Sequence, residues 1–487
     1  MSDVIIHKKN EVYIKLQCEP HILYELQQYF TFEVPNAKFA PAYRSRHWDG
    51  LIRLLSVHTG ELYVGLLDKL IEKLKLHNYT YEFRENKFYG LPFEINEEIS
   101  QEGTTGYMQS ICSHTPRAYQ IDGVYEALKY NRKLLISPTA SGKSLMIYSL
   151  VRYYVSKGLK ILLVVPTTSL VEQMYKDFED YGWDASSYCH KIYSGREKTN
   201  EYQVTITTWQ SIYKLEQNFF ENYNVVIGDE CHLFKAKSLI GIMNKLHNTK
   251  YRFGFTGTLD GSQTHKWVLE GMFGPSYKVT RTAELMEQGH VSKLNIKCLV
   301  LKHPPQKFES FEDEIKFIIQ HEKRNKFIRN LVCDLKGNTL VLFSRIETHG
   351  EPLYNLINSH TDKERKVFFV HGGVNTNERE QVREITESEE NAIIVASYGV
   401  FSTGINIRNL HNVVFASPSK SRIRNLQSIG RVLRKGSNKT KAMLYDIADD
   451  CTYNSRKNYT LNHFIERIKI YNEEQFNYEI ITVDFRK

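Results

Sequence analysis

The sequence lacks the features that mark membrane, secreted and disordered chains. No apolar run approaches the roughly 18 residues that span a bilayer, and the start, MSDVIIHKKN, has no long apolar stretch like that of a signal peptide. The seven cysteines form no CxxC pair, which disfavours a disulfide framework and a zinc site. Neither a Pro/Ser tract nor a long acidic run is present. We therefore expect a soluble, intracellular protein with free thiols.

The composition is that of an ordinary globular protein with a slight excess of positive charge. At about 150 residues per domain, 487 residues suggest roughly three domains. The chain has 64 Lys and Arg against 56 Asp and Glu, a formal net charge of +8. This balance is compatible with a polyanionic partner but does not identify one.

A phosphate-binding loop is predicted at LLISPTASGKS, residues 134–144. An apolar run and a small-residue turn precede Gly142, Lys143 and Ser144, which open a predicted helix. In such a loop, backbone N–H groups cradle the phosphates, the lysine reaches the β and γ oxygens, and the serine hydroxyl holds Mg²⁺. Ser137 stands where the first glycine of the pattern is usual, and the alternative is an ordinary strand-to-helix turn. The predicted nucleotide-binding residues here are Thr139, Ala140, Ser141, Gly142, Lys143 and Ser144.

An acidic pair follows another apolar strand, in VVIGDECH from Val225. Asp229 and Glu230 would lie at the carboxyl edge of a parallel sheet, where ligands bind in open α/β folds. Asp229 would hold Mg²⁺, directly or through water, and Glu230 would orient and deprotonate the attacking water. A lone Asp-Glu pair is usually a solvated turn, but this one follows the lysine loop in the same series of strands. Together the two motifs predict an NTPase.

Short apolar or β-branched runs recur in two series, separated by segments with helical periodicity. This alternation is typical of parallel sheets covered on both faces, so we expect two α/β sheets in tandem. The first hundred residues mix strand-like and helical stretches and should form a small α+β domain. The predicted domains are 1–105, 106–283 and 284–487. The runs begin at Leu134, Ile161, Val204, Val225 and Tyr251, and then at Thr339, Lys366, Ala392, Val413 and Lys441.

Arginines and aromatic residues alternate in the N-terminal domain, in YRSRHWDGLIRLL from Tyr43. Cations beside aromatic rings are typical of nucleic-acid surfaces, which makes Arg44, Arg46 and Trp48 candidate contacts. A hairpin with a core tryptophan and solvated arginines explains the same pattern. We therefore predict a candidate DNA-binding domain and leave the alternative open.

Two further motifs suit a nucleotide site. In RAYQ, Gln120 can both donate to and accept from an adenine edge, Tyr119 can stack on the base, and Arg117 precedes them; the alternative is a helix start. In QSIGRVLR, Arg431 and Arg434 are three residues apart and would share one helix face. An arginine delivered to the γ-phosphate from a second domain would make hydrolysis depend on domain closure. The alternative is a solvated or phosphate-binding basic face.

In their order, these motifs resemble those of the superfamily 2 helicases, over roughly residues 114–450. That family has two RecA-like domains with ATP and Mg²⁺ between them. The resemblance implies that His232, Thr256 and Thr258 couple hydrolysis to movement, and that Gln427 belongs to the arginine motif. It also implies contacts to the strand backbone, for which the alternative is helix capping. The residues that would make these contacts are Pro166, Thr167, Thr168, Thr207, Thr208, Ser344, Arg345, Ser402, Thr403 and Gly404.

Within this superfamily, the chain looks like phage helicases that act in recombination, repair and replication. The shared features are HWDG from His47, VPTTSL from Val165, ASYGVFSTGI from Ala396, IGRVLRK from Ile429 and FNY from Phe476. This resemblance implies an ATP-dependent DNA helicase that regresses forks, migrates Holliday junctions and dissociates R-loops. Its substrates would be branched DNA, single-stranded DNA and RNA–DNA hybrids, and it would act as a monomer, aided by phage recombination proteins, in the host cytoplasm. Asn406 replaces an acidic residue found in many relatives, which leaves its role open.

Three other functions are compatible with some of these features. A double-strand DNA translocase or an RNA helicase would carry the same motor motifs. A nucleic-acid scaffold with a dead ATPase is disfavoured because Lys143, Asp229, Glu230 and both arginines are present. A nuclease is disfavoured because the chain has no spare carboxylate-rich domain outside the motor.

Overall fold

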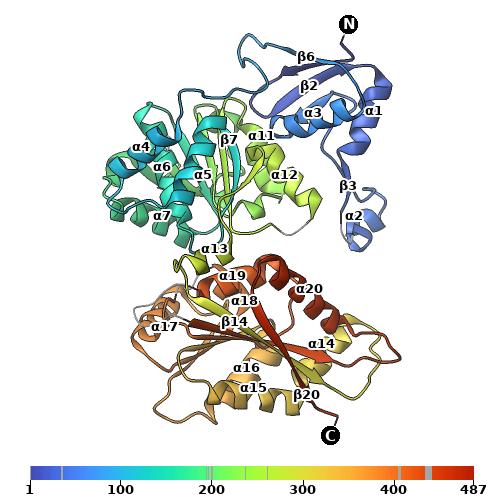
Figure 1. Cartoon of the computed structure of the whole chain (residues 1–487), viewed down its shortest axis with the longest axis vertical. Helices are drawn as coiled ribbons and strands as arrows, with labels where there is room; N and C mark the ends of the chain where they lie inside the picture. Colours follow the sequence, from blue (N-terminus) through green and yellow to red (C-terminus); the bar gives the residue numbers. More distant parts are fainter. Residues whose placement is uncertain are drawn as a thin grey trace. The chain divides into compact units, whose positions relative to one another are not determined.

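The computed structural model describes the chain in a series of ranges: residues 2–34, 37–193, 195, 197–198, 201–235, 237–259, 262–403, 407–433 and 441–486. The chain separates into two compact units, Met1–Ser137 with Gly142–Val279 and Pro138–Ser141 with Thr280–Lys487 (Figure 1). Within the described ranges, no helix has the length and apolar character needed to cross a lipid bilayer. The division into domains at 1–105, 106–283 and 284–487 stays a prediction.

A small mixed sheet forms the N-terminal part of the first unit, with the strand order β5-β2-β1-β6. Strand β2 is antiparallel to both its neighbours, whereas β1 and β6 are parallel. Helices α1 and α3 pack on this sheet (Figure 1), because Leu26 and Leu70 share a core with Ile6 and Ile14. A hairpin of β3 and β4 and a short helix, α2, follow α1. The elements are β1 (Val4–Lys8), β2 (Tyr13–Cys18), α1 (Pro20–Tyr29), β3 (Thr31–Glu33), α2 (Pro41–Arg44), β4 (Leu51–Arg53), β5 (Glu61–Tyr63), α3 (Leu67–Leu76) and β6 (Tyr81–Arg84).

The larger sheet of the first unit is parallel, and its described strands have the order β13-β7-β12-β11-β8-β10-β9. Strands β8 and β11 read ILLVV and VVIG and are buried at every residue, as expected when helices cover both faces. The strands are β7 (Arg132–Ile136), β8 (Ile161–Val165), β9 (Cys189–Ile192), β10 (Val204–Thr208), β11 (Val225–Gly228), β12 (Tyr251–Thr256) and β13 (Ser276–Lys278). The helices are α4 (Gln101–Ile111), α5 (Ala118–Tyr130), α6 (Lys143–Ser156), α7 (Thr168–Asp180), α8 (Ala185–Tyr188), α9 (Trp209–Ile212), α10 (Gln217–Phe220), α11 (Lys237–Lys245) and α12 (Gln263–Phe273).

Apolar packing joins the two sheets of the first unit. The Trp267 ring, on α12, lies edge-on to Tyr29 and Phe32, with centroids 5.2 and 5.0 Å away, and at 5.6 Å from Phe30. The backbones also approach closely, since a Cβ added at Gly65 would lie 2.0 Å from the Glu270 carbonyl oxygen. The small N-terminal sheet is therefore a packed part of the first unit.

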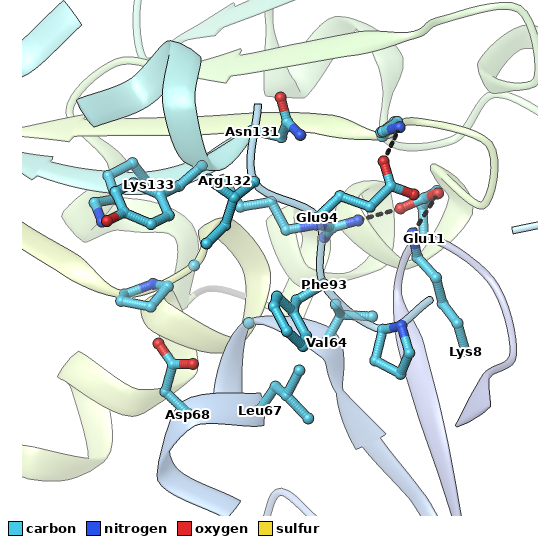
Figure 2. Close-up of a pocket in the computed structure, with 17 residues that line it drawn as sticks. Lys8, Glu11, Val64, Leu67, Asp68, Phe93, Glu94, Asn131, Arg132 and Lys133 are labelled. Atoms are coloured by element: carbon cyan, nitrogen blue, oxygen red, sulfur yellow. Dashed lines mark hydrogen bonds and ion pairs between the residues drawn. The ribbon is translucent and has the colours of Figure 1, made fainter. Parts of the chain in front are cut away.

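Buried ion pairs lie at the same joint, around a pocket (Figure 2). Lys8 Nζ is 2.9 Å from Glu11 Oε1, with side chains 4% and 6% exposed, and Glu11 also pairs with Arg132. Phe93 and Glu94, from the segment between β6 and α4, line the pocket as well. Because Arg132 begins β7, the pocket lies at the amino edge of the sheet, away from the predicted phosphate loop, which follows the end of that strand.

The second unit contains a parallel sheet whose described strands have the order β16-β17-β15-β18-β19-β14-β20. Its strands are β14 (Lys293–Lys302), β15 (Thr339–Phe343), β16 (Val367–Val370), β17 (Ile393–Ser397), β18 (Asn412–Phe415), β19 (Lys441–Asp450) and β20 (Asn477–Asp484). Its helices are α13 (Thr282–Glu287), α14 (Phe311–Gln320), α15 (Glu322–Asp334), the π-helical turn η4 (Ile346–Gly350), α16 (Glu351–Asn358), α17 (Thr376–Ser388), α18 (Tyr398–Thr403), α19 (Arg422–Val432) and α20 (Tyr459–Glu473).

The predicted fold class is confirmed, because two parallel α/β sheets in tandem follow a small domain with a mixed sheet. Every predicted run of both series is a strand. Strands β9, β13, β14 and β20 lie outside these runs. All seven cysteines are free, and Cys231 is fully buried in the core of the first unit, as a packing residue should be.

Candidate active site

The predicted phosphate loop lies between β7 and α6, at the carboxyl edge of the sheet. The Ser137 N–H donates to the Thr256 carbonyl at 2.8 Å, so the chain leaves the sheet directly after this residue. Ala140 and Gly142 both have positive φ, 68° and 80°. Backbone of this kind turns successive N–H groups toward one point and suits an anion. Lys143 then begins α6 with Gly142 as the N-cap, where the helix dipole adds to the attraction for an anion.

Lys143 is held by the acidic pair. Its Nζ lies 3.2 Å from Glu230 Oε1, with side chains 15% and 23% exposed. The Lys143 ammonium group is therefore paired with the Glu230 carboxylate. A nucleotide phosphate, which carries more negative charge, could replace this carboxylate as the partner of Lys143.

The acidic pair follows β11 with a strained turn. Glu230 has a φ of 48°, and its N–H donates to Asp229 Oδ1 at 2.9 Å. Burial and the charge of Glu230 raise the pKa of the Asp229 carboxyl to about 6. Burial also opposes ionisation of Glu230, but the Lys143 ammonium and the His232 imidazole outweigh it and hold the pKa of Glu230 below its usual value. Glu230 is therefore a carboxylate at neutral pH.

A chain of polar contacts runs from the acidic pair to the end of β12. His232 Nδ1 lies 3.3 Å from Glu230 Oε2 and 3.1 Å from Thr256 Oγ1. The Thr256 hydroxyl in turn donates to the Thr258 carbonyl at 3.0 Å. A shift of Glu230 can therefore reach the segment after β12 through His232, which is the arrangement that a coupling motif requires.

The RAYQ motif lies against the phosphate loop. The Gln120 Oε1 atom accepts from the Arg117 N–H at 2.8 Å, and a Cβ on Gly142 would lie 2.3 Å from Gln120 Nε2. Glycine leaves room for this amide and adopts the positive φ of 80° without strain. Tyr119 is 9% exposed, and its hydroxyl accepts from Arg117 Nη1 at 2.7 Å. The motif also begins α5, which confirms the helix-start interpretation, and its role at a nucleotide stays a prediction.

The predicted strand contacts in the first unit make mainly structural bonds. Thr167 is the N-cap of α7, and its Oγ1 accepts from the Leu170 N–H at 3.3 Å. The buried Thr207 hydroxyl donates to the Ile192 carbonyl at 2.9 Å. Thr208 Oγ1 lies 2.9 Å from Ser211 Oγ. Pro166 and Thr168 lie at the start of α7, where Thr168 is exposed. Their role as strand contacts stays a prediction.

In the second unit, Ser344 and Arg345 follow β15. The exposed Ser344 donates its N–H to Ser417 Oγ at 3.1 Å, and Arg345 forms two bonds to Glu312, at 2.7 and 2.6 Å. Gln427 is a partly buried residue of α19. The remaining predicted residues lie outside the described part of the chain: Gly404, Asn406 and Arg434 entirely, and Ser402, Thr403 and Arg431 in their side chains.

In the N-terminal sheet region, the RSRHW segment has features of both interpretations, a nucleic-acid surface and a hairpin with a core tryptophan. Trp48 is partly buried and donates Nε1–H to the Leu51 carbonyl at 2.8 Å. Arg53 pairs with Asp49 at the surface. Arg44 and Arg46 are exposed and could meet phosphates. The tryptophan therefore supports the turn, and the two exposed arginines stay candidates for DNA contact.

Two residues that sequence reasoning missed touch this site. Tyr181 OH lies 2.7 Å from Ser144 Oγ, and His265 Nε2 donates to the His232 carbonyl at 2.9 Å. Neither residue belongs to a motif with a recognisable spacing, so no signal in the sequence could have identified it.

Family models match three parts of the chain: "DNA helicase UvsW, N-terminal" over residues 3–84, "Type III restriction enzyme, res subunit" over 113–261, and "Helicase conserved C-terminal domain" over 322–436. The ATP-dependent DNA helicase uvsW of Enterobacteria phage T4 is 36% identical over 99% of this chain and 100% of its own length. The DNA 3'-5' translocase XPB2 of Sulfurisphaera tokodaii is 20% identical over 80% and 94%.

Solved structures agree with these matches. The crystal structure of T4 UvsW is similar with a TM-score of 0.52 and 33% identity, over 99% of both chains. A fragment of a type I restriction enzyme HsdR subunit from Vibrio vulnificus has a TM-score of 0.57 at 18% identity, over 80% of this chain and 72% of its own, and shows the fold alone.

The tandem RecA-like sheets, the ordered motifs and these matches define a superfamily 2 helicase. More specifically, the chain belongs to the UvsW family of phage helicases. It is therefore an ATP-dependent DNA helicase.

Proposed function

We propose that the carboxyl edge of β7 and β11 binds ATP with Mg²⁺, and that hydrolysis there drives the remodelling of branched DNA. The observation that carries the site assignment is the contact between Lys143 and Glu230, which joins the phosphate loop to the acidic pair. In this assignment Thr139 to Ser144 cradle the phosphates, and Arg117, Tyr119 and Gln120 bind the adenine.

The residues present suit Mg²⁺. Asp229 supplies a carboxylate, 7% exposed, and Ser144 a hydroxyl, both hard oxygen ligands. Among the described residues, no group of three or more His, Cys, Asp and Glu could hold a metal by itself, which suits an ion whose other ligands are phosphate oxygens and water. When bound, Mg²⁺ would neutralise developing charge on the phosphate oxygens.

Glu230 is proposed to change its basicity during the cycle. While the Lys143 ammonium lies beside Glu230, it holds the pKa of Glu230 low, so the carboxylate is a weak base. Once Lys143 turns to the phosphates, Glu230 loses its closest cation and its pKa rises. The carboxylate can then orient the attacking water and accept its proton. His232 and Thr256, which contact Glu230 in series, would carry this change toward the DNA contacts.

The second RecA-like domain, 284–487, is proposed to supply Arg431 and Arg434 to the γ-phosphate. Hydrolysis would then depend on closure of the two motor domains, and each cycle would shift the strand contacts of one domain past those of the other. The N-terminal domain, 1–105, would bind DNA through Arg44 and Arg46. Similarity to the ATP-dependent DNA helicase of phage T4 over the full length supports DNA as the substrate. Forks, Holliday junctions and R-loops are the branched forms included in the proposal.

The test is steady-state ATP hydrolysis by the wild type and by Glu230→Gln. Each protein is measured without nucleic acid and then with single-stranded DNA, duplex DNA, a four-way junction or single-stranded RNA. We expect strong stimulation by the junction, and no stimulated hydrolysis by Glu230→Gln although it still binds ATP. Equal rates for duplex and junction would contradict branch preference, and stimulation by RNA alone would indicate an RNA helicase. Wild-type rates in Glu230→Gln would refute the site assignment.

A double-strand translocase is the second candidate, because a relative that matches 80% of the chain is described as a DNA 3'-5' translocase. Both functions predict the same hydrolysis. An unwinding assay separates them: a helicase displaces the labelled strand of a forked duplex, whereas a translocase displaces a bound protein and leaves the duplex intact.

A further inference from the structure

A tyrosine outside the known motifs contacts the proposed metal ligand. Tyr181 OH lies 2.7 Å from Ser144 Oγ, and either hydroxyl can be the donor in this pair. Tyr181 is the residue after α7, and Ser144 is the second residue of α6. The contact therefore joins two helices of the first motor domain at the phosphate loop.

The Tyr181 side chain is held on several sides. The backbone N–H of Tyr181 donates to the Asp177 carbonyl at 3.0 Å, at the end of α7. Its ring lies 5.1 Å from the Tyr148 ring and 5.6 Å, edge-on, from the His114 ring, measured between centroids. The Tyr148 hydroxyl is itself fixed, because it donates to the Ile111 carbonyl at 2.8 Å. The phenol oxygen thus has a defined position beside Ser144.

A hydroxyl that ligates a metal uses an oxygen lone pair and still carries a proton, which needs an acceptor. We propose that Tyr181 is a positioning residue whose phenol oxygen accepts a hydrogen bond from the Ser144 hydroxyl and so directs the Ser144 lone pairs toward the Mg²⁺ ion of the bound nucleotide. The inference rests on the proposed role of Ser144 as a metal ligand. Without the phenol oxygen, the Ser144 hydroxyl would rotate freely, and metal binding would have to order it.

The experiment titrates Mg²⁺ against binding of a fluorescent, non-hydrolysable ATP analogue to the whole protein. For Tyr181→Phe we expect the half-maximal Mg²⁺ concentration to rise about three- to tenfold, the usual worth of one hydrogen bond, with nucleotide binding in EDTA unchanged. Tyr107→Phe is the matched control, since Tyr107 donates to the Ser149 carbonyl on the same helix and does not touch Ser144. A Tyr181→Phe midpoint at or below the wild-type value would overturn the inference.

A double-mutant cycle with Ser144→Ala separates positioning from general support. If Tyr181 acts through Ser144, Tyr181→Phe adds no further shift in the Ser144→Ala protein, whereas a merely structural role would add its full effect and refute the proposal. The cycle also separates the two hypotheses. A shift in Ser144→Ala but not in Tyr181→Phe rejects only the positioning role, while wild-type midpoints in both reject Ser144 as a metal ligand as well.

Discussion

The two large sheets end their strands in different ways at the carboxyl edge. After β7, the chain takes positive φ at Ala140 and Gly142, and Lys143 is left with a carboxylate that a phosphate could displace. After β15, Arg345 bonds to both oxygens of Glu312, and His349 and Gly350, at the end of the turn that follows, are buried. We call the first junction open, because its backbone can turn toward an anion, and the second closed, because His349 and Gly350 of its turn are packed in the core.

The glycines at the two junctions show the same contrast. A Cβ on Gly142 would lie 2.3 Å from the Gln120 amide, whereas a Cβ on Gly350 would lie 2.4 Å from the Phe343 ring. The first glycine makes room for a polar group beside the predicted phosphate loop, and the second makes room for an aromatic ring in a core. We infer that the first junction is built for ligand exchange and the second for rigidity.

The largest expected effect is at the open junction. Lys143→Ala should lower the rate of ATP hydrolysis by roughly 1000-fold, because it removes a preorganised charge at the transferring phosphate. Steady-state hydrolysis with saturating DNA measures it. The control is Lys157→Ala, an exposed residue just beyond the other end of α6, which should behave as wild type. Hydrolysis by Lys143→Ala at the wild-type rate would refute the site.

The second prediction asks whether the second domain contributes to the chemistry. Arg434→Ala should lower turnover by about 100-fold or more, because an arginine finger stabilises charge only in the transition state. The affinity for ATP, measured by equilibrium binding, should stay within about twofold for the same reason. Arg456→Ala, an exposed arginine outside the motif, is the control. Unchanged turnover in Arg434→Ala would mean that this residue does not act at the nucleotide.

The third prediction tests the rigidity of the second unit. Glu314 is fully buried and accepts hydrogen bonds from the Asn458 side chain and from the Tyr459 and Thr460 N–H groups, at 2.7 Å each. Glu314→Ala leaves the Tyr459 and Thr460 N–H groups at the start of α20 without this acceptor, whereas the Asn458 amide keeps its bond to the Asp449 carbonyl. The loss should destabilise the second unit by about 3 kcal/mol. Urea unfolding followed by far-UV circular dichroism measures the loss.

Tryptophan fluorescence shows which unit is affected, because all four tryptophans, Trp48, Trp183, Trp209 and Trp267, lie in the first unit. Its transition should not move in Glu314→Ala. Glu312→Ala is the matched control on the same helix, since Glu312 is exposed and bonds to Arg345 at the surface. An equal loss of stability in both variants would contradict the special role of the buried carboxylate.

The sequence predicted the scaffold better than its edges. Strands such as β8 and β11 are apolar throughout because both their faces are buried, and that pattern needs no further context. Strand β20 reads NYEIITVD and lies at the sheet edge with most of its residues exposed, so its sequence carries no comparable signal. Strands β9 and β13 are short, with four and three residues, and give too little pattern to recognise.

The same limit applies to the candidate site. Lys143 and Glu230 were predicted at one edge because each motif follows a strand, and all strands of a parallel sheet end on the same side. Tyr181 reaches Ser144 only through the packing of α7 against α6, which no local pattern encodes. Thr207 shows the opposite case: its motif suggests a strand contact, yet the side chain is buried and bonded to a neighbouring strand.

The smallest expected effect concerns pH and the closed junction. His349 is fully buried beside Ser417, with Nδ1 2.9 Å from its Oγ, and burial with the nearby Arg324 charge lowers the pKa of His349 to about 3. The unfolded chain takes up this proton near pH 6.5, whereas the folded unit does not until pH is near 3. Protons therefore favour unfolding in this window, and the second unit should lose about 2 kcal/mol between pH 7 and pH 5.

His349→Gln tests this origin, because glutamine can still bond to Ser417 but does not titrate. Its stability at pH 7 can be lower than that of the wild type, yet the change between pH 7 and pH 5, measured by urea unfolding at each pH, should shrink by about 2 kcal/mol. His360→Gln, at an exposed histidine of the same unit, should keep the wild-type change. If His349→Gln also keeps the wild-type change in stability between pH 7 and pH 5, then protonation of His349 does not destabilise the closed junction. The contrast between a rigid and an exchangeable strand end would then not hold.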